Sequence, residues 1–119
     1  MSARKTVAER YFDGFRRSDH ALILSCLTDD VVWQIHGHVT LQGKAAFDGE
    51  IENPAFDGQP LLDVHRVIEE GDVVATTGRG RAMFRDGGEF IFDFATFLTF
   101  ADDLIRRVDS YVVPIGGEA

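Results

Sequence analysis

The second half of this chain alternates between apolar and polar residues with the period of two that is typical of half-buried β-strands. This pattern predicts strands at residues 61–69, 73–85, 89–100 and 104–113. Very short connections separate them, and two of these carry the turn sequences Glu70-Gly71-Asp72 and Asp86-Gly87-Gly88. Strands joined this closely are expected to follow one another in an antiparallel meander.

The first half has helical periodicity instead. Val7, Tyr11 and Phe15 recur at i, i+4 and i+8, which predicts a helix over residues 3–17. Further predicted elements are helices at 20–27 and 43–52 and a strand at 31–36. Helices gathered before a meander indicate an α+β architecture. Interior glycines in the strand 73–85 permit strong curvature. We therefore predict a curved antiparallel sheet wrapped around N-terminal helices, forming a cone with an internal pocket.

Composition restricts the class of protein. A chain of 119 residues fits one domain, which we place at residues 6–115. Its net charge of −8 argues against nucleic-acid and anionic-membrane partners. The densest basic pairs, Arg16-Arg17 and Arg106-Arg107, are interpreted as solvated faces. The single cysteine, Cys26, lies in an apolar run and is expected to be a buried structural thiol. With neither a signal-peptide core nor a membrane-length apolar run in the sequence, we expect a cytoplasmic protein.

The stretch 10–19 (RYFDGFRRSD), followed by Asp30-Val31-Val32-Trp33, is the most specific local pattern in the sequence. It resembles the SnoaL-like and ketosteroid-isomerase-like branch of the nuclear transport factor 2-like superfamily. Residues 43–47 resemble the family's glycine-initiated third helix, and residues 105–114 resemble its final strand. The resemblance implies the cone fold, a pocket for a small apolar or polyketide-like molecule, and a homodimer formed through the sheet face. It implies no single reaction, because the superfamily includes isomerases, cyclases, dehydratases, hydrolases and members without known catalysis.

The resemblance also places family functional positions on this sequence. The first-helix tyrosine of ketosteroid isomerases falls on Tyr11, their proton-shuttling aspartate on Ile35, and their protonated aspartate near Thr96. The acid–base aspartate of the cyclases and limonene epoxide hydrolases falls on Ser110. None of the three aspartate positions therefore carries a carboxylate here.

Other residues are candidates for acid–base chemistry. His36 lies at the end of a predicted strand and could act as a general base at the mouth of the cone. His36 and His38 have the spacing of a metal-ligand pair but lack an evident third ligand, so we expect no metal and no cofactor. Asp93 would be a good acid if it faced the interior, whereas strand alternation favours an outer position paired with Arg79, Arg81 or a dimer partner.

The predicted pocket has a mainly apolar lining with a few polar groups. The apolar residues expected to contact a ligand are Phe15, Trp33, Ile35, Phe47, Ile51 and Val112, and the polar ones are Tyr11, Thr96 and Ser110. Three functions remain open. The first is a proton-transfer enzyme with Tyr11, His36 and Asp93 as candidate catalytic residues. The second is a non-catalytic ligand-binding domain, and the third is a protein-interaction module that uses the outer face of the sheet.

Overall fold

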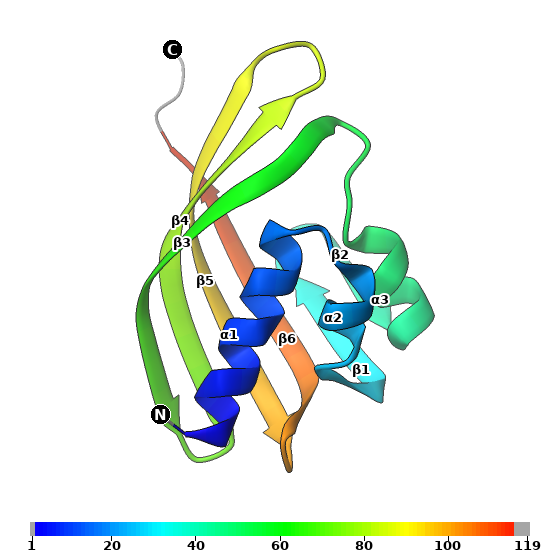
Figure 1. The fold of residues 1–119 in the computed structure, drawn as a ribbon, viewed down its shortest axis with the longest axis vertical. Helices are drawn as coiled ribbons and strands as arrows, with labels where there is room; N and C mark the ends of the chain where they lie inside the picture. The colour runs from blue at the N-terminus through cyan, green and yellow to red at the C-terminus, as the bar shows by residue number, and fades with distance from the viewer. Residues whose placement is uncertain (1, 116–119) are drawn as a thin grey trace.

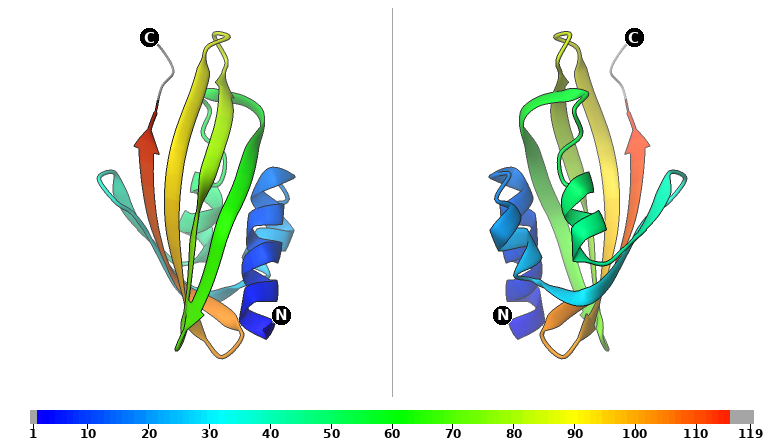
Figure 2. Two further views of the ribbon diagram at one scale, coloured as in Figure 1. Left: turned by 90° about the vertical axis from the view of Figure 1, so that its left-hand side faces the viewer. Right: turned by 90° about the vertical axis from the view of Figure 1, so that its right-hand side faces the viewer.

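The computed structural model describes residues 2–115. Three helices and six strands follow one another as α1 (Ala3–Arg16), α2 (His20–Leu24), β1 (Leu27–Ile35), β2 (Val39–Gln42), α3 (Lys44–Glu50), β3 (Phe56–Glu70), β4 (Val73–Phe84), β5 (Glu89–Ala101) and β6 (Leu104–Pro114). The strands form one curved sheet that does not close into a barrel, and the helices lie on one side of it (Figures 1 and 2). The predicted α+β architecture is confirmed.

The strand order across the sheet is β2-β1-β6-β5-β4-β3. Strands β3 to β6 form the antiparallel meander that the turn sequences predicted. The pair β1–β6 is parallel and joins the first strand to the last. This long-range pairing places β1 beside the C-terminal strand, so distant parts of the chain lie next to each other in the sheet.

The first two helices begin at side-chain caps. The Ser2 hydroxyl accepts a hydrogen bond from the Lys5 amide at the start of α1, and the Asp19 carboxylate accepts one from the Leu22 amide at the start of α2. The two helices pack closely because position 14 is a glycine. A Cβ at Gly14 would lie 2.6 Å from the side chain of Ile23.

The core lies between the helices and the sheet. Its fully buried members are drawn from every layer and include Ile23, Cys26, Leu27, Val31, Phe47, Leu98, Phe100, Ile105 and Val108. The Cys26 thiol is buried as predicted, and burial raises its pKa. Among the described residues, no helix is both long enough and apolar enough to cross a membrane.

Some element boundaries differ from the sequence predictions. The strand predicted at 31–36 begins at Leu27, because Leu27 pairs with Ile105 of β6, and α2 ends at Leu24. Strand β3 begins at Phe56, in a segment predicted as a loop. Phe56 pairs with Phe84 and their rings stack with centroids 4.8 Å apart, so cross-strand packing overrides the local turn sequence.

Candidate functional site

Two ring contacts identify the face of the sheet that the helices cover, here called the inner face. Phe94 of β5 packs against Phe12 of α1 with ring centroids 5.8 Å apart, and Trp33 of β1 stacks on Phe47 of α3 at 4.2 Å. Successive strand residues point to opposite faces, so these contacts assign the alternate residues of each strand. The opposite face, here called the outer face, has no helix over it in the described part of the chain (Figure 2).

Ile35, Ser110 and Thr96 lie side by side on the inner face across β1, β6 and β5. Ser110 is the register partner of Ile35 in the parallel pair and of Thr96 in the antiparallel pair. These are the three positions at which the family resemblance placed carboxylates, and the fold brings them together. They hold an isoleucine, a serine and a threonine, so this row carries no group that titrates near neutral pH.

Ser110 is the polar centre of this row. Its Oγ accepts a hydrogen bond from Trp33 Nε1 at 2.9 Å. A serine hydroxyl is both acceptor and donor, so its own proton stays available to a third group. The indole is buried and stacked on Phe47, which fixes the direction of the bond to Ser110. The arrangement therefore presents a hydroxyl donor on an otherwise apolar surface.

Tyr11 lies on the other side of the same aromatic cluster. Its ring contacts Phe15 at a centroid distance of 5.1 Å and Phe47 at 6.3 Å. Burial, and to a smaller extent the Cys26 thiol, raises the pKa of the Tyr11 hydroxyl far above its usual range. The phenol therefore stays neutral and is a hydrogen-bond donor rather than an acid–base group at physiological pH.

The apolar side chains around Ser110 are only partly covered. Phe15, Ile35 and Ile51 are partly buried against the core, and Val112, which pairs with Phe94, is 45 % exposed. The residues predicted to contact a ligand thus form one region, called the inner site: Tyr11, Phe15, Trp33, Ile35, Phe47, Ile51, Thr96, Ser110 and Val112. Tyr11, Trp33, Phe47 and Thr96 are buried, so the partly exposed surface of the inner site is apolar with the Ser110 hydroxyl as its polar group.

The inner face of β4, β5 and β6 continues this apolar character. The residues that the ladder register assigns to it are Val74, Thr76, Gly78, Gly80, Ala82, Phe84, Phe90, Phe92, Phe94, Thr96, Leu98, Phe100, Ile105, Val108, Ser110, Val112 and Pro114. Within these described strands, no inner-face position carries a carboxylate or an imidazole. A general acid or base would have to come from elsewhere.

Asp93 does not supply a general acid to the inner face, because it lies on the outer face. Its carboxylate accepts a hydrogen bond from Arg79 Nε at 2.8 Å, and the Arg79 guanidinium holds the pKa of Asp93 below its usual range. The structure therefore contradicts the inner position, with a raised pKa, on which a catalytic acid role for Asp93 depended. The alternation of phenylalanines along β5 did predict this outer position.

His36 also lies on the outer face, away from the mouth of the cone. Its Nε2 is 2.9 Å from Asp109 Oδ1, and its ring stacks on Tyr111 with centroids 4.0 Å apart. Partial burial acts to raise the pKa of Asp109, but hydrogen bonds from Arg107 and His36 outweigh it and hold that pKa below its usual range. The position predicted for His36 as a general base is therefore wrong.

The metal-ligand spacing of His36 and His38 does not produce a shared site. His38 Nε2 lies 3.6 Å from Glu50 Oε2, whereas His36 turns to Asp109. Within residues 2–115, no three side chains of the metal-ligating types come together as a possible metal site. Gly37, between the two histidines, has φ of 82° and belongs to the turn between β1 and β2.

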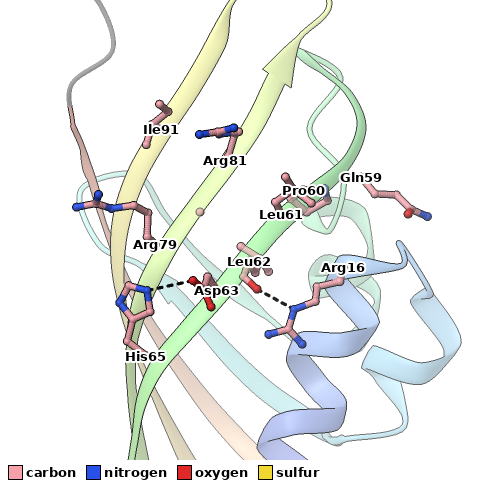
Figure 3. A pocket seen from close by; sticks show the side chains of 11 residues that line it. Arg16, Gln59, Pro60, Leu61, Leu62, Asp63, His65, Arg79, Arg81 and Ile91 are labelled. Atoms are coloured by element: carbon pink, nitrogen blue, oxygen red, sulfur yellow. Dashed lines mark hydrogen bonds and ion pairs between the residues drawn. The ribbon is translucent and has the colours of Figure 1, made fainter.

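Two hollows lie outside the inner site. The larger, of about 930 Å³, crosses the outer face of β3, β4 and β5 and reaches Arg16 at the free edge of β3 (Figure 3). Its Arg79 and Arg81 pair with Asp93 and Glu89, so these charges are matched within the protein. The smaller, of about 350 Å³, lies between α1 and the strands β3 and β4.

Arg16 lines both hollows, a role that the sequence pattern did not predict. From the sequence, Arg16 and Arg17 form a solvated pair. In the structure Arg17 pairs with Asp13, whereas Arg16 Nε donates to the Leu62 carbonyl oxygen at 2.9 Å. The spacing of Phe12 and Arg16 at i and i+4 was the available signal, because it places both on one side of α1.

Solved structures share this fold. A nuclear transport factor 2-like protein of unknown function from Burkholderia pseudomallei has a TM-score of 0.87 at 19 % identity, covering 93 % of this chain and 91 % of that one. TerC, co-crystallised with polyporic acid, has a TM-score of 0.82 at 24 % identity, covering 92 % and 91 %. An LEH-like epoxide hydrolase from M. tuberculosis has a TM-score of 0.79 at 16 % identity, covering 92 % and 81 %.

At these identities the structural likeness shows the fold alone. No curated protein is similar enough in sequence to match this chain. The family model of the SnoaL-like domain, however, matches residues 8–108, which include most of α1, Ile35 and Thr96 of the inner-face row, and most of the core, and which end before Ser110. The chain therefore belongs to the SnoaL-like domain family.

Proposed function

We propose that this protein binds a small, largely apolar molecule at the inner site and has no acid–base residue of its own there. The observation that carries the proposal is the Ser110 hydroxyl, which is fixed by Trp33 and surrounded by partly exposed apolar side chains. Ligand sites are typically apolar surfaces with a few placed polar groups. The inner site has this composition.

Binding is favoured over proton-transfer catalysis by the placement of the titratable groups. A general base must reach the reacting proton within hydrogen-bond distance or through one water. Asp93, Asp109 and His36 all lie on the outer face, separated from the inner site by the thickness of the sheet. The hydroxyls of Ser110 and Tyr11 can donate to a ligand, and among residues 2–115 neither is hydrogen-bonded to a base that would activate it.

The aromatic character of the site suggests the ligand class. The cluster of Tyr11, Phe15, Trp33 and Phe47 is continued along β5 by Phe92 and its neighbours. Ring faces and edges in such a surface stack favourably on planar apolar molecules. TerC was co-crystallised with polyporic acid, which makes that compound a rational first probe for this chain.

Titration with polyporic acid tests the proposal, and Trp33 reports on it because it is the single tryptophan. We expect saturable quenching of Trp33 fluorescence. Ser110→Ala should weaken binding roughly fivefold, since it removes one hydrogen bond worth about 1 kcal/mol. Tyr11→Phe isolates the contribution of the phenol without changing the ring. Ser25→Ala, on the exposed end of α2, is the matched serine control and should bind as wild type.

Equal affinity of wild type, Ser110→Ala and Tyr11→Phe for polyporic acid would contradict the proposal, because it would show that the probe binds elsewhere. A panel of planar aromatic compounds extends the test by thermal shift, because specific binding raises apparent stability by mass action. If no compound of the panel shifts the melting temperature of the wild type, the binding proposal fails.

We also propose that two copies of the chain associate through the outer face. Phe97, Tyr111 and Val113 are exposed there and lie on the neighbouring strands β5 and β6. The rings of Phe97 and Tyr111 meet edge to face with centroids 6.0 Å apart, so they form one apolar patch. Contiguous apolar patches of this kind commonly mark interaction surfaces.

Sedimentation velocity measures this association directly. We expect a dimer for the wild type and a monomer for Phe97→Glu, because an unpaired charge buried in an interface raises the dissociation constant by about 100-fold or more. Thr6→Glu adds the same charge on the exposed side of α1 and should remain dimeric. A wild type that sediments as a monomer at all concentrations contradicts the proposal.

A further inference from the structure

The hollow of about 350 Å³ between α1 and the strands β3 and β4, here called the α1–β3 groove, is separate from the inner site. The helix side of the groove is formed by Lys5, Ala8, Glu9, Phe12 and Arg16, and its sheet side by Val64, Val67 and Thr76. Tyr11 and Phe15 project from another side of α1, toward Phe47 and Trp33. The helix therefore separates two binding surfaces.

The floor of the groove is apolar. Ala8, Phe12 and Thr76 are buried, and the Thr76 hydroxyl donates to the Thr96 carbonyl oxygen at 3.0 Å, so its hydrogen bond is already satisfied. Val67 is 40 % exposed although it faces the helix across the groove. The groove thus leaves apolar surface open that a ligand could cover.

The positive charge at one end of the groove favours an anionic ligand. Most arginines of the described chain pair with carboxylates, among them Arg17, Arg79 and Arg107. Arg16 instead donates through Nε to the Leu62 carbonyl oxygen, which fixes the guanidinium at the free edge of β3 (Figure 3). Within residues 2–115 no carboxylate lies within ion-pair distance of it, so its terminal nitrogens are free to hold one in a bidentate bond.

The other end of the groove is less suited to an anion. Lys5 lies there, but Glu9 follows it by one helical turn and also lines the groove. A ligand carboxylate near Lys5 would be repelled by Glu9, whereas Arg16 lies two turns farther along the helix. The charge pattern therefore orients an amphipathic ligand with its acid group at Arg16.

We propose that the α1–β3 groove binds an unbranched alkyl monocarboxylate. The carboxylate bonds to the Arg16 guanidinium, and the alkyl chain lies over Phe12, Val64 and Val67. The volume of about 350 Å³ is at the small end of ligand pockets, which suits a single medium-length chain. This site is independent of the function proposed for the inner site.

Titration with decanoate, below the concentration at which it forms micelles, tests the site. We expect chemical-shift changes at the methyl groups of Val64 and Val67, with the Trp33 indole N–H unmoved. Decanol, which has the same chain without the charge, should bind at least about tenfold more weakly, as expected when a charged hydrogen bond is lost. Equal affinity for decanoate and decanol would overturn the role of Arg16.

Matched variants locate the head group. Arg16→Met should weaken decanoate binding about tenfold or more, and Arg16→Lys, which keeps the positive charge, should bind more tightly than Arg16→Met. Arg17→Met removes the neighbouring arginine, which is bonded to Asp13, and should leave binding unchanged. A larger loss from Lys5→Met than from Arg16→Met would overturn the proposed orientation.

A second pair of variants locates the alkyl chain. Val67→Glu introduces a charge into the exposed floor and should abolish decanoate binding. Ile68→Glu, the next residue on β3, makes the same change on the outer face and should not. Binding that survives Val67→Glu, or that shifts the Trp33 indole N–H instead of the valine methyls, would place decanoate at the inner site and overturn the proposal.

Discussion

Phe47→Ala is expected to lower the free energy of unfolding by about 3–5 kcal/mol. Phe47 is 0 % exposed and is the buried residue of α3. Its ring stacks on Trp33, so truncation would leave a cavity beside the indole. Helix α3 has only seven residues and is too short to be stable without packing. Loss of this one anchor should release α3 and open the inner site.

Urea unfolding, followed by Trp33 fluorescence, measures the change. Phe97→Ala is the matched control at low protein concentration, because Phe97 is 40 % exposed on the outer face. This substitution should lower the free energy of unfolding by only roughly 1 kcal/mol. The same variant should bind ligands at the inner site as wild type does. A similar loss of stability for both variants would contradict the view that Phe47 fixes the site.

The faces of the strands could be predicted from the sequence. Strand alternation predicts that Thr96 and Ser110 lie on the inner face and Asp93 on the outer face, and the ladder confirms this. The position of Ile35 beside Ser110 follows from the parallel pairing of β1 with β6. The family resemblance suggested related roles for the two positions, but local pattern alone does not determine the pairing of strands so distant in the sequence.

The turn after β1 shows why strand β2 and the direction of the His36 side chain could not be predicted from the sequence. The sequence of His36-Gly37-His38 predicts a strand end with two candidate metal ligands, whereas the segment connects β1 to the short strand β2. Strand β2 was missed because Val39–Gln42 is only four residues long and gives a weak periodic signal. The direction of His36 depends on Asp109 and Tyr111 of β6, which are distant in the sequence.

The α1–β3 groove depends on tertiary structure in the same way. Helical spacing shows that Phe12 and Arg16 share a side of α1, but the apolar strand residues opposite them are known only once β3 is placed. The absence of a carboxylate partner for Arg16 within residues 2–115 is likewise a result of the fold. By sequence spacing Asp13 could pair with Arg16 or Arg17, and in the structure it pairs with Arg17.

Gly78→Ala is expected to destabilise the protein by about 3 kcal/mol, which is at the upper end of the usual cost of overpacking. A Cβ at Gly78 would lie 2.2 Å from the backbone oxygen of Asp63 and 2.7 Å from the Phe94 ring. A backbone oxygen cannot turn aside as a side chain can, so β3 itself would have to shift. This strand carries a register irregularity between Val64 and Arg66, where β3 passes α1. The substitution should therefore disturb the α1–β3 groove as well as the sheet.

Gly80→Ala is the control for Gly78→Ala. It tests whether the close approach of the β3 backbone causes the loss of stability, or whether any alanine at a glycine position of β4 does so. A Cβ at Gly80 would lie 2.2 Å from the Phe92 ring, and the nearest atoms all belong to that partly buried side chain. Phe92 can rotate away, so we expect a cost of only about 1 kcal/mol. Thermal unfolding of the two variants beside the wild type measures the difference. Equal destabilisation would mean that the close approach of β3 to Gly78 is not what requires glycine there, and that strand curvature alone accounts for both residues.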